Sequence, residues 1–95
     1  MRYDVRLSIA AQRDFDALPP AVQQQVLKRL EGLAEDPRPS GFKPLTEKGL
    51  KGTNRVHVGR DYCIAYDIDD RSKTVEVWQI GNRRSFYEKA KRRRR

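Results

Sequence analysis

Hydrophobic positions near the start of the chain change from a spacing of two residues to the spacing of a helix. Residues 3–7 alternate between apolar and polar side chains, which is the pattern of a half-buried strand. Ser8 follows as a helix cap, and the apolar side chains of residues 11–18 recur at helical spacing. The Pro19-Pro20 pair ends this helix, and a second helix is predicted up to Pro37. Its apolar stripe consists of Val22, Val26, Leu30, Leu33 and Ala34.

The second half of the chain has the spacing of β-strands. Residues 42–53 contain charges and glycines and are predicted to be a loop with little regular structure. Three strands are then predicted over residues 54–58, 62–68 and 74–80. Strands in series with short turns form an antiparallel meander. We therefore predict an α+β fold, with an N-terminal strand and an antiparallel helical pair packed on a small twisted antiparallel β-sheet, and a short C-terminal helix or tail.

Positive charge changes this picture at the C-terminus. The 95 residues include 21 Lys and Arg against 13 Asp and Glu, a formal net charge of +8. Residues 71–95 hold ten of the basic and two of the acidic side chains, so they carry the whole excess. We predict a single domain over residues 1–91 and a basic tail over residues 92–95. The tail is either a solvated end or an arm that contacts phosphates, and nucleic acid is the first partner to test.

Several classes of protein are excluded by composition. No stretch approaches the roughly 18 apolar residues of a membrane-spanning helix, and the start of the chain does not resemble a signal peptide, so we expect a cytoplasmic protein. Cys63 and His57 are the single cysteine and the single histidine. Neither an intramolecular disulfide nor a structural zinc site can form from them, and we expect no metal and no cofactor.

Candidate chemistry lies on the predicted outer face of the sheet. The strand over residues 54–58 turns two valines to the core, so Arg55 and His57 leave on the opposite face. Cys63 falls on that face too, where small side chains would leave an open depression. Arg83, Arg84 and Tyr87 follow the last strand and reach its rim. These are either ordinary surface residues or an RNA site, because the RNA 2′-OH is itself a nucleophile that needs only a base, cations and an acid.

Short motifs in a fixed order strengthen the second interpretation. They are Lys43-Pro44-Leu45, Leu50-Lys51-Gly52, Arg55-Val56-His57-Val58-Gly59, Asp61-Tyr62, Tyr66-Asp67-Ile68-Asp69-Asp70, and Ile80-Gly81-Asn82-Arg83-Arg84 followed by Tyr87. Together they resemble the RelE/ParE superfamily of toxins from toxin–antitoxin pairs. The resemblance implies a helical pair on a small antiparallel sheet. For the RelE-like branch it implies a ribosome-dependent mRNA endonuclease that works without metal by 2′-OH attack.

The resemblance also implies roles for individual residues. Catalytic positions of RelE-like toxins correspond to Arg55, His57, Arg83 and Tyr87, and recurrent lysines of the family correspond to Lys43 and Lys51. The residues that we expect to bind RNA are Lys43, Lys51, Arg60, which is an extra residue in its turn, and Arg84. Cys63 stands where the family pattern has an active-site arginine. The implied partners are a cognate antitoxin, the ribosome and mRNA. Two alternatives remain open: a ParE-like toxin that inhibits DNA gyrase without catalysis, and a basic RNA-binding module without catalysis.

Overall fold

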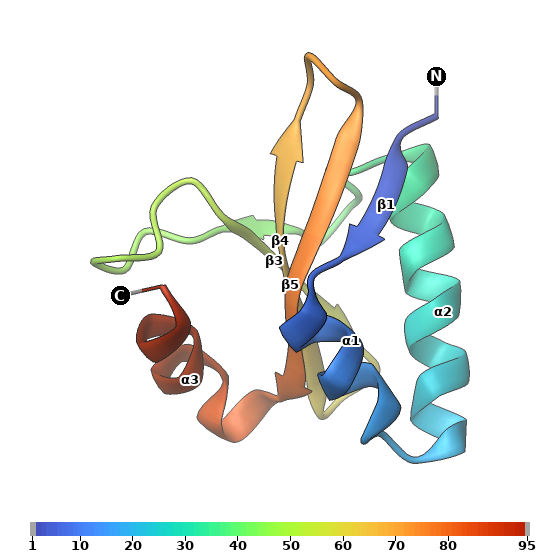
Figure 1. Cartoon of the computed structure of the whole chain (residues 1–95), viewed down its shortest axis with the longest axis vertical. Helices are drawn as coiled ribbons and strands as arrows, with labels where there is room; N and C mark the ends of the chain where they lie inside the picture. The colour runs from blue at the N-terminus through green and yellow to red at the C-terminus, as the bar shows by residue number, and fades with distance from the viewer. Residues whose placement is uncertain (1, 95) are drawn as a thin grey trace.

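The computed structural model describes residues 2–94 and has a mixed α/β architecture. A strand, two helices and the later strands follow one another as the periodicity predicts, and the α+β fold is confirmed (Figure 1). The elements are β1 (Asp4–Leu7), α1 (Ile9–Asp16), α2 (Pro20–Glu35), β2 (Lys43–Pro44), β3 (Asn54–Val58), β4 (Tyr62–Asp69), β5 (Thr74–Asn82), the 3-10 turn η1 (Arg83–Ser85) and α3 (Phe86–Arg93).

The five strands form one sheet in the order β1-β5-β4-β3-β2. Strands β3, β4 and β5 are the predicted antiparallel meander. The sheet is not antiparallel throughout, because β1 runs parallel to β5 with Val5 opposite Val75. Within the predicted loop, β2 adds a two-residue antiparallel pair in which Lys43 lies opposite Arg55.

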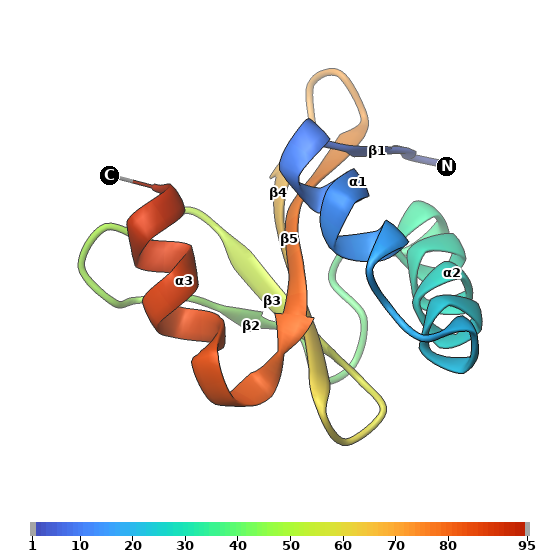
Figure 2. The same cartoon turned by 60° about the horizontal axis from the view of Figure 1, so that its bottom comes forward.

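One face of the sheet carries the larger core. Helices α1 and α2 cover this face (Figures 1 and 2), and their predicted apolar stripes point into it. The predicted cap is present, since the Ser8 hydroxyl accepts a hydrogen bond from the backbone N–H of Ala11. The fully buried members from the sheet include Val56, Ile64, Tyr66, Val75 and Val77.

The opposite face is not open, contrary to the sequence-based expectation. Helix α3 and the loop between β2 and β3 lie across it (Figure 2) and enclose a second cluster. Cys63 and Ala65 therefore form the floor of a small core and leave no surface depression, with exposed fractions of 1% and 0%. The other members of this cluster are Leu45, Leu50, Trp78, Phe86 and Ala90.

Ion pairs attach α3 to the rest of the fold. The Arg93 guanidinium donates two hydrogen bonds to the Asp14 carboxylate of α1, at 2.7 and 2.9 Å. Arg94 pairs with Asp67 at 2.5 Å and lies over the Trp78 ring. Helix α3 therefore includes the first two residues of the predicted basic tail, because it continues through Arg93. Arg95 lies outside the described residues.

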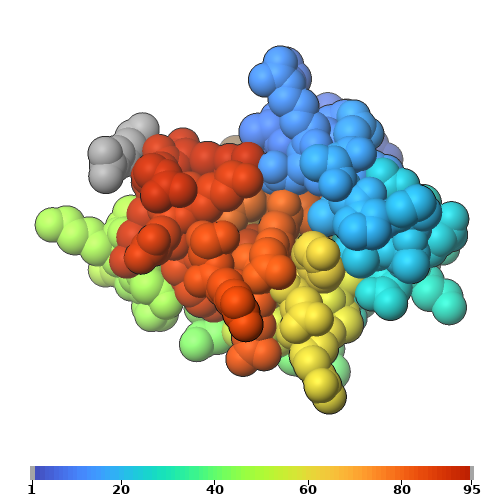
Figure 3. Space-filling view, turned by 90° about the horizontal axis from the view of Figure 1, so that it is seen from below, coloured from blue at the N-terminus to red at the C-terminus, as the bar shows by residue number. Residues whose placement is uncertain are grey.

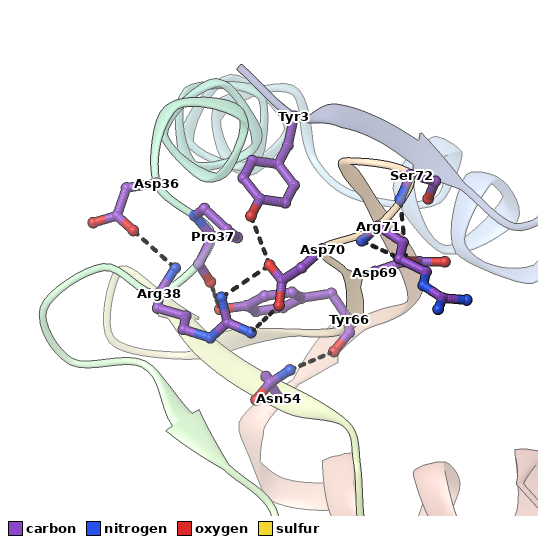
Figure 4. A network of polar contacts seen from close by, with 10 residues as sticks. All are labelled: Tyr3, Asp36, Pro37, Arg38, Asn54, Tyr66, Asp69, Asp70, Arg71 and Ser72. Atoms are coloured by element: carbon purple, nitrogen blue, oxygen red, sulfur yellow. Dashed lines mark hydrogen bonds and ion pairs between the residues drawn. The ribbon is translucent and has the colours of Figure 1, made fainter. Parts of the chain in front are cut away.

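A polar network joins three segments at the other end of the sheet (Figure 4). Asp70, in the β4–β5 turn, accepts hydrogen bonds from the Tyr3 hydroxyl at 2.6 Å and from both terminal nitrogens of Arg38. These bonds, led by that from Arg38, lower the pKa of Asp70 to about 2. The Tyr66 hydroxyl donates to the Pro37 carbonyl, which fixes the connector after α2. Among residues 2–94, no helix is long and apolar enough to cross a membrane.

Candidate functional site

Arg55 and His57 are neighbours on β3, as their alternation predicts. The Arg55 guanidinium donates a hydrogen bond to Nε2 of His57, and the other ring nitrogen, Nδ1, lies 3.4 Å from the Cys63 sulfur. Cys63 is directly opposite His57 on β4. Because arginine has no acceptor, Nε2 must carry the lone pair and Nδ1 the hydrogen. The two neighbours together select one neutral tautomer of His57.

Electrostatics keep the His57 ring neutral. Partial removal of water from the ring lowers its pKa, and positive charge on Arg55 lowers it further. Two more cations, Arg83 and Arg29, add to the effect. Because the ordinary histidine pKa is near 6.5, a lowered value leaves the ring uncharged at neutral pH. A neutral imidazole among cations is the state in which histidine can accept a proton.

Cys63 stays in its thiol form. Burial raises the pKa of Cys63, and this effect outweighs the opposite influence of Arg55 and Arg83. The residue is 1% exposed. It therefore supplies no positive charge where the family pattern has an arginine, and its interaction with the site is the contact to His57.

Arg55 itself is more enclosed than an outer-face residue was expected to be. It is 8% exposed, and its Nε is buried without a hydrogen-bond partner among the described residues. Its charge is thus held under the cover formed by α3 and the β2–β3 loop, with one side facing His57. A cation in such a place interacts strongly with any anion that reaches it, because little water screens it.

Arg83 and Arg84 lie at the start of η1, in a recess shared with the β3–β4 turn. The Arg83 backbone N–H donates to the Asp61 carbonyl at 2.8 Å, and the Asn82 side chain accepts from the Arg84 N–H. Figure 3 shows these two segments side by side, with the turn in yellow and the end of β5 in orange. The recess has a volume of about 580 Å³ and is lined by Asp61, Asn82, Arg83 and Arg84.

The other residues predicted from the sequence lie on α3, on β2, in the β2–β3 loop and in the β3–β4 turn. Tyr87 is half-buried in the first turn of α3, where its ring packs edge-on against Phe86 with 5.7 Å between centroids. Lys43 is exposed on β2 opposite Arg55. Lys51 is exposed in the β2–β3 loop, and Arg60 is exposed in the β3–β4 turn. The structure therefore joins Arg55 to His57 directly, whereas the two exposed lysines and Arg60 lie on flanking segments.

Arg29 is a site residue that the sequence does not reveal. It comes from α2, where it lies outside the apolar stripe and has the pattern of a solvated surface residue. In the fold it lines a groove together with His57, and its charge contributes to the low pKa of that ring. No metal-ligating group of three or more His, Cys, Asp or Glu side chains is found within residues 2–94.

A family model matches residues 5–87 of the chain, and its description is ParE toxin of type II toxin-antitoxin system, parDE. Among solved structures, a chain of the toxin–antitoxin complex RelBE2 from Mycobacterium tuberculosis is 33% identical. The match covers 87% of this chain and 93% of that one, with a TM-score of 0.78. No curated protein sequence gives a significant match.

Two more distant structures share the fold. A chain of the archaeal RelE–RelB complex from Pyrococcus horikoshii is 21% identical, with a TM-score of 0.75, over 88% of this chain and 98% of that one. The free E. coli toxin RelE, in a form with two arginines replaced by alanine, is 22% identical. Its TM-score is 0.74, and 98% of each chain is covered.

Proposed function

Because the chain belongs to the ParE toxin family of type II toxin–antitoxin systems, with a cognate antitoxin as its partner, we propose that it stops translation by cleaving mRNA on the ribosome. The proposed reaction is attack of a 2′-OH on the adjacent phosphate, without metal. The main support for this proposal is the neutral His57 ring, which is held in one tautomer beside Arg55 and within the field of Arg83. A base and cations at one place are what this reaction requires.

In the proposed mechanism, binding of the RNA phosphate frees His57 from Arg55, so that His57 can act as the base. The lone pair of Nε2 is occupied by Arg55 in the free protein. An incoming phosphate is a stronger partner for a guanidinium than a neutral imidazole, because the hydrogen bonds become charge-assisted on both sides. Movement of Arg55 to the phosphate would free Nε2, while Cys63 would keep Nδ1–H in place. His57 would thus become active only when RNA is bound.

The proposed step balances with the residues at hand. His57 Nε2 takes the proton of the 2′-OH, the 2′-oxygen forms a bond to phosphorus, and the bond from phosphorus to the 5′-oxygen breaks. Arg55 and Arg83 stabilise the negative charge that develops on the phosphate. The Tyr87 hydroxyl donates a proton to the leaving 5′-oxygen. The proton held by His57 then passes to solvent while Tyr87 takes one from solvent, so both residues return to their starting states. The products are a cyclic 2′,3′-phosphate and a free 5′-OH.

Exposed cations flank the proposed reaction centre and would hold the strand. All four are exposed: Lys43 lies opposite Arg55, Arg84 lines the Arg83 recess, and Lys51 and Arg60 lie on the segments before and after β3. Contacts of this kind with phosphates position a nucleic acid without reading its sequence. The choice of cleavage site would then come from the ribosome, which presents one short stretch of mRNA at a time.

A second candidate function is inhibition of DNA gyrase without catalysis. It is favoured by the description of the matching family model, which names a ParE toxin. A second observation points the same way: the neutral Cys63 thiol stands where the resemblance expects an active-site arginine. In this case the basic surface would bind a protein or DNA target, and Arg55 and His57 would have no chemical role.

Two assays run in parallel separate the two functions. The purified protein is added to a translation extract and, in parallel, to a gyrase supercoiling reaction. We expect mRNA to be cut only when ribosomes are present, and Arg83→Ala to lower the cleavage rate by about 10²–10³. Arg71→Ala, which removes an exposed arginine of the β4–β5 turn, is the matched control and should cut at the wild-type rate. Intact mRNA together with inhibited supercoiling would establish the second function instead.

A further inference from the structure

A basic groove runs along the edge of the sheet next to the proposed reaction centre. Its volume is about 510 Å³. Strand β2 pairs only with Asn54 and Arg55, so the outer edge of residues 56–58 has no strand neighbour within residues 2–94. Helix α2 forms the opposite wall of the groove. The lining residues are Gln25, Lys28, Arg29, His57, Val58 and Gly59.

Helix α2 turns three polar side chains toward this groove. Gln25, Lys28 and Arg29 have the spacing i, i+3 and i+4, which brings side chains to one face of a helix. The helix also approaches the β3–β4 turn closely, because a Cβ built on Gly59 would lie 3.1 Å from the Gln25 amide oxygen. Gln25 and Gly59 thus bring the helix and the β3–β4 turn together within the lining of the groove.

The groove has positive charge that the protein does not neutralise. The Arg29 Nε is buried without a hydrogen-bond partner among the described residues, and Lys28 is exposed. No carboxylate lines the groove over the described chain. The field of Arg29 reaches His57, which forms part of the same wall. A buried donor on a cation without a partner is costly, so an anion that enters gains both a hydrogen bond and an ion pair.

We propose that this groove is a second phosphate-binding subsite, which holds the RNA backbone next to the scissile phosphate through Lys28 and Arg29. The groove shares His57 with the proposed reaction centre, so a strand that lies in it is continuous with the reacting nucleotide. A nucleic acid fits better than an acidic peptide for this reason. Its place in a cleavage reaction rests on the proposed function, whereas RNA binding does not.

The test measures binding of a fluorescently labelled single-stranded oligouridylate to the full chain at increasing salt concentration. The variant Lys28→Gln/Arg29→Gln removes both groove charges, and Arg13→Gln/Arg71→Gln removes two exposed charges elsewhere. For single strands, each phosphate contact contributes about 0.7 to the slope of log K against log salt. We therefore expect the groove variant to lower the slope by roughly 1.4, and the control to change it little. Circular dichroism establishes that both variants are folded.

Equal slopes for the groove variant and the control would overturn the subsite. The groove variant could instead lose binding to an oligoglutamate of equal charge while its RNA binding stays unchanged. That result would assign the groove to an acidic peptide and would also overturn the phosphate-binding subsite. Because the assay uses RNA alone, the result is independent of ribosomal cleavage. A wild-type protein that leaves mRNA intact in the translation extract contradicts the proposed function, while a changed salt slope still supports the subsite.

Discussion

The ion pair between α1 and α3 makes a sharp prediction about stability. The Asp14 side chain is nearly buried, with 9% of its surface exposed, and the Arg93 side chain is 23% exposed. The carboxylate accepts two hydrogen bonds from Arg93 and one from the Ile80 backbone N–H at 3.0 Å, and Lys89 lies 3.7 Å away. Replacing Asp14 by alanine leaves the Ile80 N–H without its acceptor, and leaves the Arg93 guanidinium with the Trp78 carbonyl at 3.2 Å in place of a carboxylate.

The magnitude follows from these contacts. Removing one partner of a buried ion pair costs about 3–5 kcal/mol, and the partial exposure of Arg93 places this pair near the lower end. We expect Asp14→Ala to lower the free energy of unfolding by about 3 kcal/mol. For a chain of this size, this corresponds to a decrease of roughly 12–24 °C in the melting temperature. Asp14→Asn keeps an acceptor for Ile80 and should cost less.

Urea unfolding followed by circular dichroism measures the effect. Asp16→Ala is the matched control, because within residues 2–94 this exposed carboxylate of the same helix accepts a hydrogen bond only from Gln12. Its expected change is within about 0.5 kcal/mol. A double-mutant cycle with Arg93→Ala should give a coupling energy of at least about 1 kcal/mol. Equal effects of the two aspartate variants, or no coupling, would refute the anchoring of α3 by this pair.

The pH dependence of the same pair has a definite sign. Burial alone would raise the pKa of Asp14, but the bonds from Arg93 and Ile80 and the nearby positive charges lower it overall. The folded pKa is thus below the unfolded value of about 3.8, so the stabilisation is complete above pH 3.8 and is lost as the pH falls through the folded pKa. Asp14→Asn should lack this acid-dependent loss.

Three further predictions concern other parts of the fold. The His57 ring should titrate below pH 6.5 by NMR, and Arg55→Gln should raise its pKa; an unchanged value would mean that Arg55 does not face the ring. Asp70 should titrate at about pH 2, and Arg38→Gln should raise its pKa toward the ordinary value; a normal pKa in the wild type would contradict the network. Phe86→Ala should lower the free energy of unfolding by about 3–5 kcal/mol, because it empties the second cluster; a loss below 1 kcal/mol would show that α3 does not pack there.

The main elements could be predicted because their signals are local. The helices α1 and α2 have apolar stripes and clear end signals, and strands β3 to β5 alternate over five to nine residues. The second core could not be predicted in the same way. It depends on Leu45 and Leu50 from a loop and on Phe86 and Ala90 from a helix of eight residues. In the sequence, that helix is dominated by its basic residues, which resemble a solvated end.

The candidate site, too, could be predicted only where its signals are local. Arg55 and His57 share a face by strand alternation, so the sequence indicates their proximity. The burial of Arg55 could not be inferred, because it results from α3 and the β2–β3 loop covering the sheet. The place of Arg29 next to His57 joins residues far apart in the chain, and nothing in the local pattern of α2 distinguishes Arg29 from other surface cations.

The parallel pairing of β1 with β5 has a consequence for the order of folding. Strand β5 lies between β1 and β4 in the sheet, yet it is the last strand to be synthesised. A nascent chain emerges from its N-terminus, so β1 waits without a partner while most of the sequence is made. Arg83, Tyr87 and the cover formed by α3 come later still. The nascent chain therefore cannot assemble the proposed site before β5 and α3 have both been made.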